Sequence, residues 1–87
     1  MESRNCPVDV ICVCSADGQI QPLRLRLEDE EQQTLQISID RVLSREVTYY
    51  AGIETHVFFC RAMVYNRQWQ FELRYAVNKH KWSLRRV

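Results

Sequence analysis

Residues 55–87 decide the fold, and they read THVFFCRAMVYN (55–66), RQWQFELRYAV (67–77) and NKHKWSLRRV (78–87). In the middle segment apolar side chains alternate with polar ones, so that one parity holds Trp69, Phe71, Leu73, Tyr75 and Val77. This period of two predicts a strand with one buried face and one face in water. Asn66-Arg67 and residues 78–81 fall where turns would join that strand to its neighbours. The stretch therefore predicts three consecutive antiparallel strands.

The preceding residues continue the pattern of short strands and turns. We expect strands at 8–15, 21–27, 34–42 and 55–65, and a turn at Ala16-Asp17-Gly18. The last of these strands is apolar on both faces, which suggests a central position or a covered outer face.

Residues 41–54 are less regular, and their apolar spacing fits either a strand or a short helix. We interpret them as the end of a strand, a bend near Ser44 and a short extended piece that Ala51-Gly52 closes.

These elements predict an all-β fold. A chain of 87 residues supports one core, so we expect a single domain over 1–87, with 1–7 frayed. Five or six strands with short connections predict a small antiparallel curled sheet or barrel of SH3-like or OB-like proportions, with at most one short helix.

The cysteines and one tryptophan are expected inside this fold. Cys12 and Cys14 lie two apart in a predicted strand, and Cys60 lies in an apolar run, so we expect reduced, buried side chains rather than disulfides. Trp69 begins the longest alternation, and we place it at the centre of the core.

No motif points to catalysis or to a cofactor. The Cys-x-x-Cys spacing that usually marks a zinc site does not occur. His56 and Cys60 would stand about 13 Å apart along one strand, too far for a base to activate a thiol. Two isolated glycines cannot build a phosphate-binding glycine loop. We therefore expect a non-enzymatic protein without a metal or cofactor.

Charge is distributed unevenly along the chain. Residues 1–43 carry four Lys or Arg against eight Asp or Glu, whereas residues 44–87 carry eight against three. Turns and the polar parity of the last strands hold the basic residues that we predict to form one binding surface, namely Arg67, Arg74, Lys79, Lys81 and Arg85. Such a surface suits single-stranded nucleic acid, since cations follow the phosphates and aromatic rings stack on bases. An acidic protein is the alternative partner.

The end of the chain also resembles a group of small proteins. Phe71-Glu72-Leu73-Arg74-Tyr75, followed by Trp82-Ser83-Leu84-Arg85-Arg86-Val87, is similar to small bacterial β-proteins that end in a Trp-x-Leu-x-Arg pattern. The resemblance covers the last third of the chain. It implies a role in nucleic-acid metabolism in a bacterial cytoplasm, and it assigns no catalytic residue.

A self-associating subunit is the competing hypothesis. The outer parity of residues 55–65 carries Val57, Phe59 and Met63, and a second apolar face on so small a domain suggests a homodimer interface. The longest apolar run near the N-terminus, 10–14, is too short to span a membrane. We expect a cytoplasmic protein without a membrane partner.

Overall fold

The computed structural model describes residues 6–28 and 31–86. Its described residues form an all-β structure without a helix, with strands β1 (Cys6–Cys14), β2 (Ile20–Glu28), β3 (Thr34–Ser38), β4 (Arg41–Tyr50), β5 (Ile53–Val64), β6 (Arg67–Ala76) and β7 (Lys81–Arg86). The all-β prediction is confirmed. Of the stretch expected to fray, residues 1–5 lie outside the described residues, and Cys6 and Pro7 pair with Leu84 and Ser83 of β7.

The seven strands form one antiparallel sheet in the order β3-β2-β1-β7-β6-β5-β4. The expected five or six strands are too few, because residues 34–42 break at Ile39-Asp40. There the Ile39 amide donates to the Leu23 carbonyl of β2, and the Asp40 amide donates to the Arg61 carbonyl of β5, both at 2.9 Å. The sheet is open, with β3 and β4 at its edges, so the curled or barrel shape is not confirmed.

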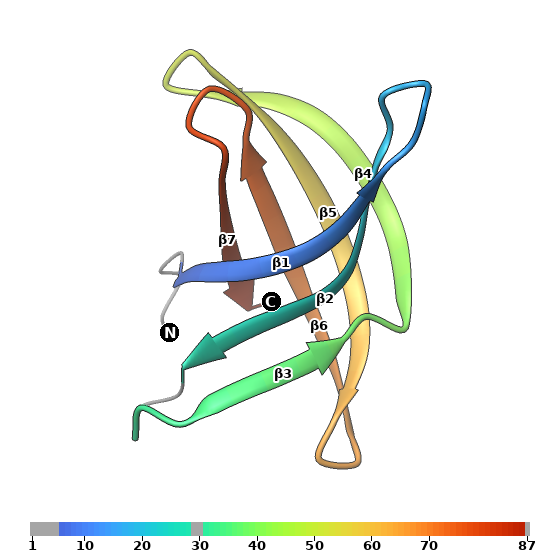
Figure 1. Ribbon diagram of the computed structural model, residues 1–87, viewed down its shortest axis with the longest axis vertical. Coiled ribbons are helices and arrows are strands. Elements are labelled where there is room, and N and C mark those ends of the chain that lie inside the picture. The colour runs from blue at the N-terminus through green and yellow to red at the C-terminus, as the bar shows by residue number, and fades with distance from the viewer. Residues whose placement is uncertain (1–5, 29–30, 87) are drawn as a thin grey trace.

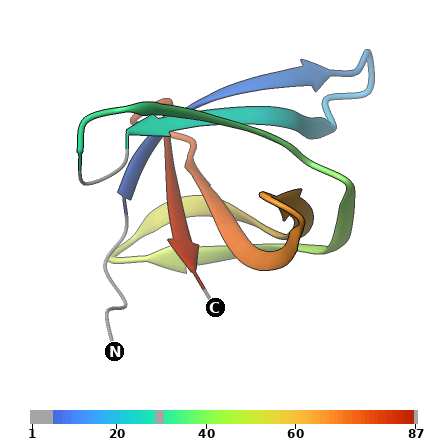
Figure 2. The same cartoon turned by 90° about the horizontal axis from the view of Figure 1, so that it is seen from below.

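The core lies where β2 and β3 pass across one face of β4–β7 (Figures 1 and 2). Leu25 and Ile37 come from the crossing strands, and they belong to one buried cluster with Phe58, Phe71 and Leu73. All five are at most 2% exposed. Phe71 and Leu73 alternate with polar side chains along β6, so the hydrophobic pattern fixes which face of this strand turns inward.

Positive backbone angles mark the hairpin turns. Tyr65 and Asn66 have φ of 51° and 63°, as the two-residue turn between β5 and β6 requires. This turn lies one residue earlier than predicted, so Arg67 begins β6. The turn at Ala51-Gly52, with φ of 52° and 82°, is confirmed, as is the turn that ends at Gly18.

Two predictions about the core are wrong. Cys12 and Cys14 are exposed, because β1 pairs with β7 only over 6–8 and the rest of the strand has no neighbour on that side among the described residues. Trp69 is only half-buried and packs against the margin of the core, since it lies near the β5–β6 turn, opposite Ala62. By contrast Cys60 is fully buried, as predicted.

Candidate functional site

The surface of β4–β7 that points away from the core forms a candidate binding surface, which we call the outer face. Residues opposite each other on neighbouring antiparallel strands share a face of the sheet. The register gives six rows on the outer face: Tyr50 and Ile53; Thr48, Thr55, Ala76 and Lys81; Glu46, Val57, Arg74 and Ser83; Ser44, Phe59, Glu72 and Arg85; Arg41, Arg61 and Gln70; and Met63 and Gln68. Four strands therefore contribute side chains to one surface.

Positive charge exceeds negative charge on the outer face. Among the described residues on this face and in the β6–β7 turn beside it, six side chains are cationic and two are carboxylates, Glu46 and Glu72; the cations are Arg41, Arg61, Arg74, Lys79, Lys81 and Arg85. The surface thus carries an excess of four positive charges at neutral pH.

Four of the five predicted basic residues lie on or beside this face. Arg74, Lys81 and Arg85 belong to its rows, and Lys79 lies in the turn beside Arg74 and Ser83. Arg67 does not join them, because it is opposite Val64 at the far end of β6 and shares the parity of the core residues.

Two arginines of the outer face lie outside the predicted set. Arg41 and Arg61 are opposite each other on β4 and β5. The sequence contains a signal for Arg61, since it is the only cation in the apolar run of β5. Arg41 emerges only from the pairing of β4 with β5, which the irregular pattern of 41–54 did not reveal.

Arg74 has the most constrained side chain of the cluster. It is 14% exposed, and its guanidinium carbon lies 4.6 Å from the centre of the Tyr50 ring. Its Nη2 is 3.8 Å from Glu72 Oε2, and Arg85 Nη1 is 3.9 Å from the same oxygen. Both distances exceed hydrogen-bond length. Arg74 Nε is buried without a hydrogen-bond partner.

A hollow of about 330 Å³ opens beside Arg74 on the outer face. Side chains from four strands and the β6–β7 turn line it, namely Tyr50, Ile53, Thr55, Arg74, Ala76, Lys79 and Ser83. Thr55 is buried at its base, and its hydroxyl donates to the Ile53 carbonyl at 3.1 Å. The hollow therefore combines an aromatic ring, hydroxyl groups and two cations.

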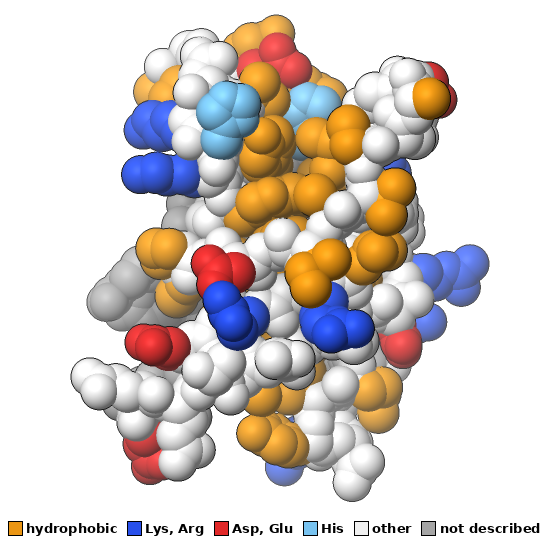
Figure 3. Space-filling view, viewed as in Figure 1, with side chains coloured by type: hydrophobic (Ala, Val, Ile, Leu, Met, Phe, Trp, Pro, Cys, Tyr) orange, Lys and Arg blue, Asp and Glu red, His pale blue; other side chains and the backbone are white. Residues whose placement is uncertain are grey.

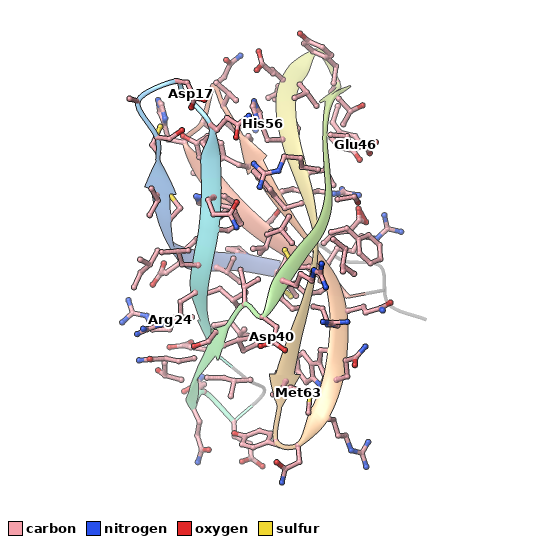
Figure 4. The ribbon with its side chains drawn as sticks, turned by 90° about the vertical axis from the view of Figure 1, so that its right-hand side faces the viewer. Asp17, Arg24, Asp40, Glu46, His56 and Met63 are labelled. Carbon is pink, nitrogen blue, oxygen red and sulfur yellow. The ribbon has the colours of Figure 1, made fainter. Side chains whose placement is uncertain are left out.

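A second hollow, of about 240 Å³, lies between the β1–β2 hairpin and β4–β5. In Figure 4 His56 lies between β4 and the hairpin tip that carries Asp17. Arg45 Nη1 donates to the Ile20 carbonyl at 3.1 Å, and the Arg45 guanidinium lies 5.5 Å from the centre of the Phe58 ring. These contacts join β4 to β2, so Arg45 has a structural role here.

Aromatic side chains continue from this second hollow across β7 and β6. The ring centres of Phe58 and Trp82 are 5.7 Å apart, and those of Trp82 and Tyr75 are 4.9 Å apart. The Tyr75 hydroxyl lies 3.0 Å from His80 Nδ1. Figure 3 shows apolar side chains between the two histidines on this side of the molecule.

The buried thiol of Cys60 is poorly suited to act as a nucleophile. Burial raises the pKa of Cys60 from 9.0 to about 12, against the smaller opposing effect of the nearby Arg45 charge. The thiol is thus protonated at neutral pH, and a thiol is a poor nucleophile. Within residues 6–28 and 31–86, no group of three or more His, Cys, Asp or Glu side chains is arranged to hold a metal ion.

The three residues predicted for self-association differ in accessibility. Val57 is 5% exposed, Phe59 is half-buried and Met63 is 54% exposed. Val57 lies on the outer face between Glu46 and Arg74, so polar side chains separate it from solvent and from a continuous apolar patch.

Comparison with known proteins returned no relative. No protein-family model matches the chain, and neither the curated proteins nor the solved structures contain a match. In the part of the chain that the structure describes, there is no helix of the length and apolarity needed to cross a membrane.

Proposed function

We propose that this protein is a non-enzymatic binding module whose outer face binds single-stranded nucleic acid. The observation that carries the proposal is the register of β4–β7, which gathers six cations against two carboxylates on one surface. A phosphate backbone is attracted by such a surface through its charge, whatever the base sequence.

The distribution of the cations favours an extended polyanion. Arg61 is opposite Gln70, and Lys81 is opposite Ala76. Six residues of β6 separate these positions, which corresponds to roughly 20 Å along the strand. A ligand that contacts both cations is elongated, as a nucleic-acid strand is.

Aromatic and polar side chains on the same surface favour a single strand with accessible bases. Tyr50 is 43% exposed at one end of the outer face, and Phe59 is half-buried in the middle. Aromatic rings beside cations bind unpaired bases by stacking, and sheet surfaces commonly present them in this way. Gln68 and Gln70 are exposed polar neighbours at the other end.

We also propose that the chain closes into a small barrel of OB-like or SH3-like proportions. Support comes from Ile39 and Asp40, whose amides bond to β2 and β5 and so link the two edges of the open sheet. Slow hydrogen exchange of both amides is expected for a closed barrel, and rapid exchange of both contradicts closure.

A cytoplasmic location is part of the same proposal. Cys6, Cys12 and Cys14 are free and exposed, and free surface thiols suit a reducing compartment. The bacterial origin implied by the resemblance of residues 71–75 and 82–87 stays an expectation.

Charge reversal tests the function. Arg61→Glu combined with Arg85→Glu should weaken binding of a short oligothymidylate, because both side chains lie on the outer face. The slope of log affinity against log salt should flatten by about 0.7 for each phosphate that the variant no longer neutralises. Fluorescence anisotropy at several salt concentrations measures both quantities.

The matched control carries the same change in net charge elsewhere. Arg24 projects from β2 on the opposite layer (Figure 4), and Arg67 lies at the far end of β6. Arg24→Glu with Arg67→Glu should change the affinity much less than the outer-face pair. Equal losses of affinity in the two double variants would show that net charge, and not this surface, attracts the strand.

Two competing proposals would each be supported by a different experimental result. Absence of oligonucleotide binding at low salt together with binding to an acidic protein would make an acidic partner the better assignment. A dimer in sedimentation that Met63→Lys dissociates would support the self-associating subunit, since Met63 is the accessible member of its predicted interface.

A further inference from the structure

The hollow beside Arg74 contains hydrogen-bond donors that the protein itself does not use. Within the described residues the Arg74 side chain donates no hydrogen bond, and its one ion pair, with Glu72, is 3.8 Å long. A guanidinium has five N–H donors, and a mostly buried one normally pairs with acceptors. An oxyanion in the hollow would supply acceptors to the terminal Nη groups of this arginine, whereas its Nε is buried and out of reach.

The surroundings of Arg74 offer further donors from separate elements. Lys79 reaches the hollow from the β6–β7 turn, and Ser83 reaches it from β7 directly opposite Arg74. Tyr50 holds the Arg74 guanidinium by stacking, which limits its freedom before a ligand arrives. The Arg74 donors are therefore held in advance, and Lys79 and Ser83 add donors from two further elements.

We propose that this hollow is a phosphate-binding subsite, formed by Arg74, Lys79 and Ser83. The inference rests on the proposed function, since it names the place on the outer face where one phosphate of the strand binds. Arg74, Lys79 and Ser83 lie on three elements around the hollow, and several donors together suit the four oxygens of a phosphate better than the two oxygens of a carboxylate.

The size of the hollow leaves room for more than the phosphate. Its volume of about 330 Å³ lies within the usual range for ligand pockets. Tyr50, at the rim, is partly exposed and gives an adjoining sugar or base an aromatic surface. The ligand chemistry is thus a nucleotide phosphate, either internal to the strand or at its 5′ end.

Two neighbouring lysines provide the test. Lys79 lines the hollow, whereas Lys81 belongs to the same outer face but does not line it. Lys79→Gln and Ser83→Ala should each weaken binding of inorganic phosphate and of the oligothymidylate by about tenfold, because each removes a donor to a charged group. Lys81→Gln should change the affinity for inorganic phosphate by less than about twofold, and it should weaken oligothymidylate binding less than Lys79→Gln does, because it removes a cation outside the hollow. Substitutions of Arg74 are avoided, because they would also disturb its packing on Tyr50.

NMR titration with inorganic phosphate, and anisotropy with 5′-phosphorylated and 5′-hydroxyl oligothymidylate, measure these affinities. If the 5′-phosphorylated strand binds more tightly and Ser83→Ala abolishes the difference, the subsite takes a terminal phosphate. If the two strands bind equally and Ser83→Ala weakens both, it takes an internal phosphodiester. Both outcomes support the subsite.

Other outcomes separate this inference from the proposed function. Oligonucleotide binding that Lys79→Gln and Lys81→Gln weaken equally, with no effect of Ser83→Ala, would overturn the subsite and leave the outer face as the binding surface. Phosphate binding that depends on Lys79 and Ser83, without any oligonucleotide binding, would overturn the proposed function and support the subsite as a site for a small phosphate compound.

Discussion

At the scale of single residues, Arg74 contributes both to the stability of the outer face and to its positive charge. Its guanidinium stacks on Tyr50 and lies beside Glu72, with 14% of the side chain exposed. Replacing it by a carboxylate would set two acidic groups side by side with little solvent between them, which destabilises a fold. Arg85 is 39% exposed and shares Glu72, so its reversal reports on binding more cleanly.

The four cysteines should react in two classes. Cys6, Cys12 and Cys14 are exposed and should react with a thiol reagent in the native protein. Cys60 is fully buried with a pKa raised to about 12, so it should react only after unfolding. Counting labelled thiols before and after adding denaturant measures this. Four rapidly reacting thiols in the native protein would contradict the buried position of Cys60.

The same thiol should make stability depend on alkaline pH. Its pKa rises from 9.0 in the unfolded reference to about 12 in the folded protein, so unfolding releases a proton between these values. The stabilising effect is complete below about pH 9 and is lost as the pH rises towards 12. Urea unfolding at several pH values should therefore show a steeper alkaline loss of stability for the parent than for Cys60→Ala.

Core substitutions should separate the centre from the margin. Phe71 is completely buried, so Phe71→Ala should lower the free energy of unfolding by about 3–5 kcal/mol. Trp69→Ala should cost less, because Trp69 is only half-buried. Urea denaturation compares the two. A larger loss of stability for Trp69→Ala would place Trp69, and not Phe71, at the centre of the core.

Phe71 and Trp69 also show how much of the core packing can be predicted from the sequence. Alternation along residues 69–77 correctly predicts which side chains of β6 face inward. It contains no information on where β2 and β3 cross that face, and the crossing decides which inward side chains are covered. For the same reason Cys12 and Cys14 have an apolar pattern and yet are exposed.

At the scale of elements, the tight turns hold residues that are poorly suited to them. Tyr65 has φ of 51° and is 82% exposed, and bulky residues adopt this conformation at a cost. Tyr65→Asn should raise the free energy of unfolding by about 0.5–1 kcal/mol, because asparagine tolerates the conformation and little buried area is removed. Thermal unfolding measures the change.

Gly52 is the control for this turn effect. Its φ of 82° favours glycine, and no atom crowds the position where a Cβ would lie. Gly52→Ala should therefore destabilise through backbone conformation alone, by about 1 kcal/mol. If Tyr65→Asn lowers stability while Gly52→Ala has no effect, the turn geometry described here is wrong.

The sequence predicts the positions of the turns best and the ends of the strands least well. The turns at Asp17-Gly18 and Ala51-Gly52 each contain a glycine that favours the positive φ of a turn, so the sequence alone suffices to predict where these turns lie. The interpretation of 41–54 as the end of a strand, a bend near Ser44 and a short extended piece is wrong, since 41–50 form the single strand β4, whose register with β5 only shifts between Val42 and Ser44. The break at Ile39-Asp40 depends on hydrogen bonds to two distant strands, which no local pattern predicts.

At the scale of the whole molecule, the excess of cations lies on one layer of the structure. The strands β4–β7 supply the cations of the outer face, whereas β1, β2 and β3 carry Asp9 and Glu28 against Arg24 and Arg26. On the layer that contains β1 and β2, Arg26 Nη2 lies 2.7 Å from Asp9 Oδ2 and forms an ion pair with it. The sequence predicted a basic C-terminal surface, but only the strand register identifies Arg41 and Arg61 as members and removes Arg67.

The location of a bound strand tests the central claim most directly. A ¹H–¹⁵N NMR titration with a short oligothymidylate at low salt reports on every backbone amide. We predict saturable shifts on the outer face, at Arg61, Arg74 and Ser83, with little change near Arg45 and His56 in the second hollow. Shifts confined to that hollow, or no shifts at all at low salt, would contradict the assignment of the outer face as the nucleic-acid interface.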